Sequence, residues 1–367
     1  MAPVAYLLGR FPSVSHTFVY REIAHLQRLH GSVHTYALSR SDDPDHGILK
    51  PRDIQFVPSA SLVLRRKPAS QFLRARWLEH GGRIKDLRRA EWLARRWTES
   101  KVGAVHVHFL GHAAALAAVA CAIGDIPLVV TVHARGLLVP HPLGRLTLEL
   151  ATRIRTISAK TSEWVGRQWT GTPHLIPLPI AEAPLSGPSA DEQHVLTVCR
   201  PVPKKGLAVV SSALSRMDTI RWTVAGASAS EIKSAPDRLR ALGPVPFSVI
   251  DEVYRDGVDL FVLPCQVAPD GDEDAVPMAI MEAMARGVAV VSSPVGGIPE
   301  LIDDGVSGVL VPPGDSGALR DAIDRLLRDR EARTSMGIAG RNRVRETRRP
   351  DALNGALLSL LAEVTDG

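Results

Sequence analysis

Short apolar runs alternate with amphipathic stretches along most of the chain. Val4–Leu8 and Leu128–Val132 have the length of buried strands, whereas Ser15–Leu29 carries apolar residues at helical spacing. Strands that alternate with helices are typical of parallel sheets covered by helices. The pattern therefore predicts an α/β protein.

The same pattern assigns individual elements. In the first half it predicts a buried helix at Gly111–Ile123 and the strands Val4–Leu8, Val33–Ala37, Ala104–Val107, Leu128–Val132 and Ile154–Ile157. In the second half it predicts the strands His194–Cys199, Arg221–Ala225, Leu260–Leu263, Val288–Val291 and Gly308–Val311. Helices are expected at 205–216, 277–286, 298–303, 316–329, 331–347 and 351–364.

The stretch 175–193 is rich in proline, serine and small residues and breaks both periodicities, so it marks a domain boundary. A chain of 367 residues also exceeds one ordinary core. We predict an N-terminal domain at 1–180, a C-terminal domain at 181–350 and a last helix at 351–367 that crosses back to the first domain. Ligands of such sheets collect at the carboxyl ends of the strands, so we expect a cleft between two doubly wound domains.

Composition is that of a globular protein, with 45% hydrophobic and 23% charged residues. No apolar run approaches the ~20 residues that a membrane-spanning helix needs. The first residues lack the basic region of a signal peptide and are interpreted as a strand. Cys121, Cys199 and Cys265 are too far apart to indicate a metal site or a disulfide framework. Buried thiols in a reducing cytoplasm are the expectation.

Positive charge is concentrated between Arg65 and Arg96, a stretch that contains eleven Lys and Arg residues but only three acidic residues. Trp77, Trp92 and Trp97 are interleaved with them. A basic helical face with tryptophans suits an anionic membrane surface, but a solvated helix face explains the charge as well. Both interpretations stay open, whereas nucleic-acid binding lacks any accompanying module.

An acidic segment leads into the predicted helix at 277–286. Asp274 precedes it, Glu282 lies within it, and Pro277 stands where a first turn tolerates proline. Two carboxylates and free backbone N–H groups suit a ligand with sugar hydroxyls and phosphates. The simpler alternative is a helix cap and a solvent-facing glutamate. Gly296 and Gly297 follow in a strand-to-helix turn that permits close backbone approach to the same ligand.

Cations and histidines stand at other strand ends. Arg200 and Lys205 flank a loop before a helix and would suit a diphosphate, although basic surface loops are common. His108 and His133 each end a predicted strand. His106 and His112 are interpreted as structural residues.

Five separate segments resemble the retaining glycosyltransferases of family 4 with the GT-B fold. One segment is similar to the signature of their donor-binding domain: it runs from Asp274 over seven residues to Glu282 in an EAMA context and is followed by VGGIPE. So are DDGVSGVLVPPGD at 303–315, the Arg200 to Gly206 segment, GRFPSVSHTF at 9–18 and the histidine in TVH at 131–133. The resemblance implies two Rossmann-like domains facing a central cleft.

The resemblance also implies roles for individual residues. Arg200 and Lys205 would neutralise the leaving diphosphate, Glu282 would accept from the ribose hydroxyls, and His133 and Asp274 would orient the sugar. The candidate catalytic residues are therefore His133, Asp274, Arg200 and Lys205. The donor-binding set adds Glu282, Ala275, Val276, Pro277, Gly296 and Gly297, and the acceptor-side set is Gly9, Arg10, His16 and His108.

Three features depart from the family pattern. His16 stands where glutamate is usual, Asp274 replaces the usual first glutamate, and the stretch 226–258 is compressed. Asp270 and Asp272 form a DxD pair of the kind that binds metal in GT-A enzymes. Here we interpret the pair as a flexible acidic loop, because Arg200 and Lys205 supply positive charge. No metal and no cofactor are expected.

The sequence thus predicts a metal-independent, retaining glycosyltransferase that uses a nucleotide sugar, with UDP as the expected nucleotide. The acceptor is either a glycan or lipid at a membrane or a soluble natural-product aglycone, so the expected location is cytoplasmic, with optional membrane association on that side. One alternative is a catalytically weakened GT-B partner subunit. The other is a nicotinamide-dependent oxidoreductase, which the absence of GxGxxG after the first strand disfavours.

Overall fold

The chain divides into two compact units. The computed structural model describes residues 2–13, 16–43, 47–59, 70–139, 141–187, 189, 193–217, 219–233 and 236–365. The N-terminal unit comprises Met1–Pro177 and Asp351–Gly367, and the C-terminal unit comprises Leu178–Pro350. The chain therefore returns to its first unit after Pro350.

A parallel seven-stranded sheet forms the centre of the N-terminal unit, in the order β3-β2-β1-β4-β5-β6-β7. Its strands are β1 Val4–Leu8, β2 Val33–Ala37, β3 Ile54–Phe56, β4 Ala104–His108, β5 Leu128–Val132, β6 Arg153–Thr156 and β7 His174–Leu175. Its helices are α1 Thr17–His30, α2 Gln71–Glu79, α3 Ile84–Glu99, α4 His112–Gly124, α5 Ala134–Leu138, α6 Pro142–Leu150, α7 Ala159–Gly166 and α14 Pro350–Thr365.

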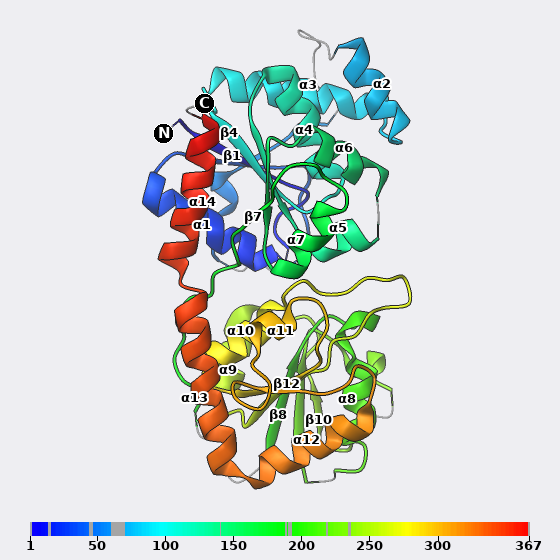
Figure 1. Cartoon of the computed structure of the whole chain (residues 1–367), viewed down its shortest axis with the longest axis vertical. Coiled ribbons are helices and arrows are strands. Elements are labelled where there is room, and N and C mark those ends of the chain that lie inside the picture. The colour runs from blue at the N-terminus through cyan, green and yellow to red at the C-terminus, as the bar shows by residue number, and fades with distance from the viewer. Residues whose placement is uncertain are drawn as a thin grey trace. The chain divides into compact units, whose positions relative to one another are not determined.

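Helices cover this sheet because its central strands are buried. Every residue of β1, β4 and β5 is buried, as expected for parallel strands with both faces covered. Figure 1 shows α1 and α14 side by side, and buried residues of both helices join β1 in one core cluster. Leu357 and Leu361 of α14 are fully buried there. The last helix is thus part of the N-terminal unit's core.

A parallel six-stranded sheet forms the centre of the C-terminal unit, in the order β10-β9-β8-β11-β12-β13. Its strands are β8 His194–Val198, β9 Arg221–Ala225, β10 Leu239–Ala241, β11 Leu260–Leu263, β12 Ala289–Ser292 and β13 Val309–Leu310. Its helices are α8 Leu207–Leu214, α9 Phe247–Arg255, α10 Met278–Ala285, α11 Ile298–Leu301, α12 Ser316–Arg328 and α13 Arg330–Thr347.

The predicted α/β class with two parallel sheets is confirmed. Strands at the centre of each sheet match the predicted ones to within about one residue, because they form continuous apolar runs. The pattern did not mark β3, β7 and β10, which lie at the edges of the sheets and have two or three residues. Such short edge strands carry too few buried positions to leave a periodicity.

The basic segment includes α2 and α3, and its tryptophans pack against the rest of the N-terminal unit. Trp77 and Trp97 are fully buried, and Trp92 packs at 6.4 Å, edge to face, against Tyr36. Trp77 and Trp97 are therefore core residues and Trp92 is half-buried, so these tryptophans do not support the membrane interpretation. Arg65, Arg66 and Lys67 lie outside the described residues. None of the described helices has the length and apolarity to cross a membrane.

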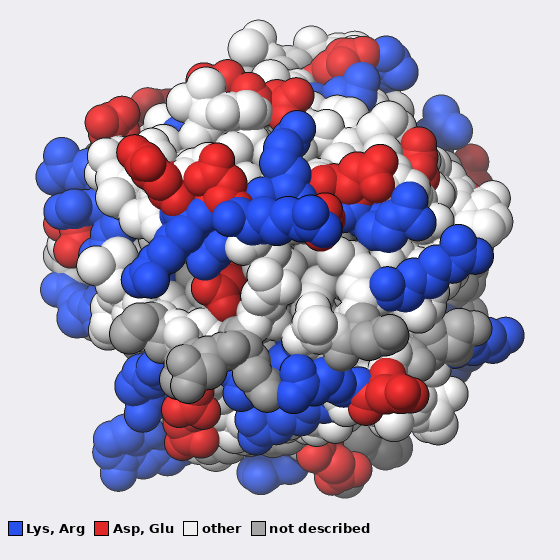
Figure 2. Space-filling view, turned by 90° about the horizontal axis from the view of Figure 1, so that it is seen from below, with Lys and Arg blue, Asp and Glu red and all other residues white. Residues whose placement is uncertain are grey.

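Charge on one face of the molecule is mixed. Figure 2 shows Lys and Arg side chains forming a band there, with Asp and Glu side chains on both sides of it. Interspersed charges of both signs produce no large field of a single sign.

Candidate active site

The carboxyl ends of three neighbouring strands bring the predicted donor-binding residues to one edge of the C-terminal sheet. Arg200 follows β8, Asp274 lies on the loop after β11, and Gly296 follows β12. Lys205 ends a short 3₁₀ turn, Pro203–Lys205, just beyond Arg200. Because these strands are adjacent and parallel, residues that are far apart in sequence meet at this edge.

Two lysines hold Asp274. Lys205 Nζ lies 2.5 Å from Asp274 Oδ2, and Lys204 Nζ lies 3.2 Å from Asp274 Oδ1. The three side chains are only 10–15% exposed. Burial acts to raise the pKa of Asp274, but Lys205 and Lys204 hold it below its ordinary value. Burial acts to lower the pKa of Lys205, and Asp274 raises it instead. Both groups are therefore charged at neutral pH.

Lys204 is a member of this site that the sequence did not single out. Its Nζ also lies 3.1 Å from Asp272 Oδ2 and donates to Glu273 O at 3.4 Å. A lysine with 8% exposure is rare unless it is paired. The only signal in the sequence was its place beside Lys205, and adjacent lysines are ordinarily both solvent-exposed.

The DxD segment is fixed through Asp272. This residue is 3% exposed and paired with Lys204, while its backbone N–H donates to Asp270 Oδ1 at 3.1 Å. The interpretation of a flexible acidic loop is therefore wrong for Asp272, because a buried ion pair holds it. We call Lys204, Lys205, Asp272 and Asp274 the lysine–aspartate network.

The glycine turn after β12 packs against the loop that carries Asp274. Gly296 N donates to Glu273 Oε2 at 3.1 Å, and Gly297 N donates to Ala275 O at 2.7 Å. Gly296 has φ +60°, and a Cβ there would lie 1.8 Å from Asp274 O. The two amides predicted to cradle the donor thus already have partners in the protein. Their contacts position the 273–275 loop instead.

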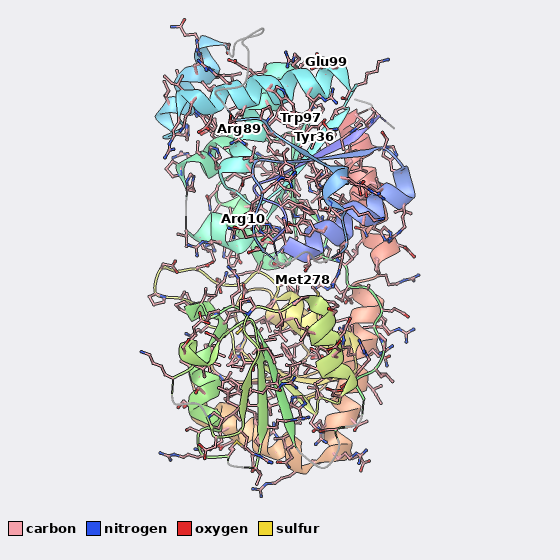
Figure 3. All side chains as sticks on the ribbon, turned by 180° about the vertical axis from the view of Figure 1, so that it is seen from behind. Arg10, Tyr36, Arg89, Trp97, Glu99 and Met278 are labelled. Carbon is pink, nitrogen blue, oxygen red and sulfur yellow. The ribbon has the colours of Figure 1, made fainter. Side chains whose placement is uncertain are left out.

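The remaining donor-side residues lie where α10 begins. Met278, labelled in Figure 3, is its first residue, and Pro277 is its N-cap. Pro277 has no N–H, so the predicted backbone donors of 275–277 reduce to Ala275 and Val276. Glu282 lies one turn into the helix and is 8% exposed. Arg200 is exposed and directly follows Cys199, whose thiol lies within reach of the charges of Arg200, Lys205 and Asp274.

In the N-terminal unit a chain of polar side chains follows the ends of β4 and β5. Arg155 NH1 donates to Glu22 Oε2, His108 Nε2 lies 2.9 Å from Glu22 Oε1, and His108 Nδ1 lies 3.2 Å from His133 Nε2. Burial acts to raise the pKa of Glu22, but Arg155 and His108 keep it well below its ordinary value. The pKa of His133 lies well below 6.5, mainly because the ring is buried and secondarily because of the charges of His108 and Arg155.

Glu22 orders this chain. An ionised Glu22 only accepts, so His108 Nε2–H donates to it. His108 Nδ1 and His133 Nε2 share the next hydrogen bond. The orientation of the His133 ring is therefore set by a chain that ends on buried Arg155.

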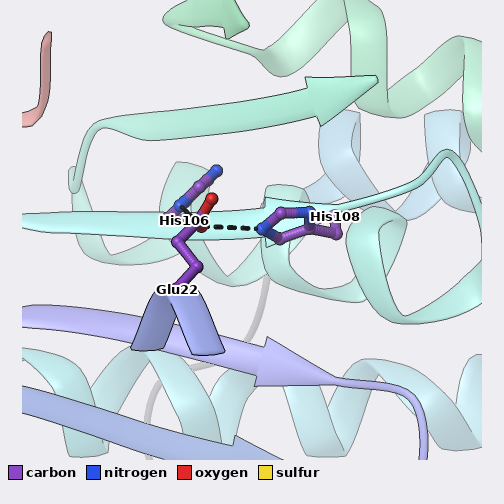
Figure 4. A group of neighbouring side chains, drawn as sticks. All are labelled: Glu22, His106 and His108. Atoms are coloured by element: carbon purple, nitrogen blue, oxygen red, sulfur yellow. Dashed lines mark hydrogen bonds and ion pairs between the residues drawn. The ribbon is translucent and has the colours of Figure 1, made fainter. Parts of the chain in front are cut away.

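Glu22, His106 and His108 form the group drawn in Figure 4, with potential ligand atoms within 4.8 Å of one another. Tyr6 donates to Glu22 Oε1 at 2.9 Å, and His106 lies 2.7 Å from both the Tyr6 and the Thr131 hydroxyls. These protein partners, together with the Arg155 guanidinium on Glu22, oppose a cation. The structural interpretation of His106 agrees with its full burial between two hydroxyls.

The acceptor-side residues of the first loop are spread around these histidines. Gly9 and Arg10 are exposed after β1, and Val14 and Ser15 lie outside the described residues. His16 packs against Phe109 at 4.9 Å, and Phe109 packs against His133 at 4.4 Å. Phe109 has φ +70°, which strains a non-glycine residue. The strained residue directly follows His108.

Residues 184–343 match the family described as glycosyl transferases group 1. The chain is 39% identical over 144 residues to the "Amylovoran biosynthesis glycosyltransferase AmsK" of Erwinia amylovora, covering 36% of this chain and 35% of that protein. It is 31% identical over 183 residues to the "GDP-mannose-dependent alpha-(1-6)-phosphatidylinositol monomannoside mannosyltransferase" of Mycobacterium tuberculosis, covering 46% of each. The chain thus spans less than half of either relative in these matches.

Solved structures share the fold over nearly the whole chain. Anabaena Alr3699/HepE, solved in complex with UDP and glucose, has a TM-score of 0.74 and 16% identity over 99% of this chain and 100% of that chain. At this identity the likeness concerns the fold, which is GT-B.

Proposed function

Through residues 184–343, this chain belongs to the glycosyl transferases group 1 family, and we propose that it transfers a sugar from a nucleotide-sugar donor to an acceptor hydroxyl, with retention of configuration. The observation that carries the proposal is the lysine–aspartate network at the carboxyl edge of the C-terminal sheet. It holds a buried ammonium group beside exposed Arg200 at the edge where such sheets bind ligands.

In this mechanism Arg200 and Lys205 stabilise the negative charge that develops on the leaving diphosphate. Cations that are already in place are worth several kcal/mol to such a step. Lys205 is held by Asp274 before the donor arrives, so little reorganisation is needed. Ala275 and Val276 N–H groups bind the donor, Glu282 accepts from the ribose hydroxyls, and a metal is not required.

In the N-terminal unit, His133 provides a polar contact to the substrate. Its neutral ring presents Nδ1, the nitrogen that does not bond to His108, to a sugar or acceptor hydroxyl, and the chain through His108 and Glu22 fixes its direction. The leaving phosphate takes the acceptor's proton, in keeping with the absence of a suitable nucleophile among the candidate residues. His133 is thus a positioning contact rather than the base.

UDP is the proposed nucleotide, a choice supported by the fold that the chain shares with a UDP-binding protein. The acceptor is proposed to be a glycan or lipid of envelope polysaccharide biosynthesis, because AmsK is named for amylovoran biosynthesis. Phe72, Leu78 and Ile84 are 48–69% exposed on α2 and the start of α3, among basic residues. They support peripheral contact of this surface with a membrane.

A thermal-shift screen of UDP-, GDP-, ADP- and TDP-sugars tests the donor site, because a ligand that binds only the folded state raises the melting temperature. UDP-sugars should give the largest rise, and Glu282→Ala should abolish it while retaining the cooperative transition. A full shift in that variant contradicts the ribose role. Hydrolysis or transfer of the bound donor separates an enzyme from a catalytically weakened subunit, and EDTA should leave the rate unchanged.

A further inference from the structure

A cavity of about 590 Å³ lies in the N-terminal unit, outside the residues assigned above. Its lining is formed by Leu38, Val57, Ser59, Lys85, Asp86, Arg88 and Arg89. This volume falls in the range of small-molecule sites. Three of the seven lining side chains are cationic, two are apolar and one is a carboxylate.

The positive charge in this cavity exceeds the negative charge. Asp86 is the acidic side chain of the lining, and it lies 3.9 Å from His112 Nε2. Within the part of the chain that the structure describes, neither Lys85 nor Arg88 forms an ion pair or a side-chain hydrogen bond. Two cationic groups are therefore available to a ligand.

Arg89 adds a third group, fixed by the fold. Its NH2 donates to Leu38 O at 2.5 Å, and its Nε is buried without a hydrogen-bond partner among the described residues. Burial lowers the pKa of this arginine, and Asp86 opposes that effect. A buried guanidinium N–H without a partner is costly, and an anion in the cavity would satisfy it. Figure 3 labels Arg89 on α3.

The cavity lies on the functional edge of the sheet. Leu38 directly follows β2 and Val57 directly follows β3, so both mark carboxyl ends of parallel strands. His133 follows β5 on the same edge. The order β2-β1-β4-β5 places three strand spacings of about 4.8 Å between them, or roughly 14 Å.

We propose that this cavity binds a phosphate group of the acceptor, roughly 14 Å from His133. The acceptor assignment rests on the proposed function, whereas phosphate binding does not. Lys85, Arg88 and Arg89 offer several donors to a tetrahedral dianion, and Leu38 and Val57 contact the apolar part next to it. The spacing implies an acceptor in which one or more sugar units separate the phosphate from the reactive hydroxyl.

The test compares phosphate binding by the full chain and by charge-matched variants. Lys85→Gln/Arg88→Gln removes two cavity cations, and Arg74→Gln/Arg95→Gln removes two cations from α2 and α3 outside the cavity lining. Binding of inorganic phosphate and glucose 6-phosphate is measured by calorimetry. Binding to phosphatidylcholine vesicles with and without phosphatidic acid is measured by co-sedimentation.

The cavity variant should lose about 10- to 100-fold in affinity for its phosphate probe, or about 1.4–2.8 kcal/mol of binding free energy, because two cationic donors are removed. The control variant should stay within about twofold of the unsubstituted protein by the same measure. Arg88→Lys keeps the positive charge but loses the two-pronged donor geometry of the guanidinium group. Its phosphate affinity should therefore lie between those of the cavity variant and the control variant. Binding of the soluble probes assigns a free phosphorylated acceptor, and binding of phosphatidic acid vesicles alone assigns a lipid phosphate.

Equal losses in the cavity and control variants overturn the proposal, as does phosphate or vesicle binding that the cavity variant leaves unchanged. Nucleotide-sugar binding is measured on the same proteins. A failure of donor binding in the unsubstituted protein contradicts the proposed function alone, since the phosphate result is read independently of it.

Discussion

Replacing Lys204 by methionine tests whether the lysine–aspartate network is held by this buried ammonium group. The substitution removes the 3.1 Å pair with Asp272 and the 3.2 Å pair with Asp274. Asp274 keeps Lys205 at 2.5 Å, whereas Asp272, 3% exposed, loses the cation that faces it. The cost therefore falls mainly on Asp272.

The loss of stability expected from Lys204→Met has a lower and an upper bound. Breaking a buried ion pair by removing one partner costs about 3–5 kcal/mol. We expect Lys204→Met to destabilise the C-terminal unit by about 3 kcal/mol. Asp272→Asn in the same chain should recover about half of that loss, since no buried charge then lacks its partner.

Native-state hydrogen exchange resolves the effect within this two-unit chain. Amides of β8 and β11 should exchange roughly 100-fold faster in Lys204→Met, while those of β1 and β4 keep their rates. Lys233→Met, at an exposed lysine of the same unit, is the matched control. Equal exchange of Lys204→Met and the control, or no recovery in the double variant, would refute a network held by Lys204.

Three further predictions follow from the same contacts. Gly296→Ala should lower the stability of the C-terminal unit by more than about 2 kcal/mol, seen as a lower melting temperature, because its Cβ meets Asp274 O at 1.8 Å and φ is +60°. His133→Ala should reduce kcat/KM for transfer by about 10²-fold and leave the donor-induced thermal shift intact; a loss confined to donor binding contradicts its place in the N-terminal unit. The Asp274–Lys205 pair should stabilise the protein from about pH 4 to pH 10. Because the pKa of Asp274 is lowered in the folded protein, the stability that Asp274 contributes is lost as pH falls below 3.8. Because the pKa of Lys205 is raised, the stability that Lys205 contributes is lost only above pH 10.5. Asp274→Asn should flatten the acid limb of a stability-against-pH curve, and an unchanged limb contradicts the pairing.

Much of the fold could be predicted because buried parallel strands and their helices leave strong periodicities. Val4–Leu8, Leu128–Val132 and Leu260–Leu263 were predicted at their observed bounds. The residues after the strands, such as Arg200 and His133, could also be placed at a sheet edge, since the carboxyl ends of parallel strands meet there. Their roles stay predictions.

Contacts between distant segments were beyond the sequence. Trp77 and Trp97 look like membrane anchors in a basic stretch, yet they are core residues because other parts of the N-terminal unit cover them. Gly296 and Gly297 look like a ligand cradle, yet their amides bind the 273–275 loop. Both features depend on burial and hydrogen-bond partners, which are set by neighbours that local patterns do not identify.

The sequence by itself determined the alternating architecture, the identity of the charged residues at the strand ends and the likeness to one family. Only the tertiary structure decided that Lys204 and Lys205 share Asp274, that Glu22 directs His108 and His133, and that Lys85, Arg88 and Arg89 line one cavity. The physical reason is that periodicity and backbone preference act over a few residues. Ion pairs, pKa shifts and cavities depend instead on distances across a packed sheet, where residues such as 22 and 155 become neighbours.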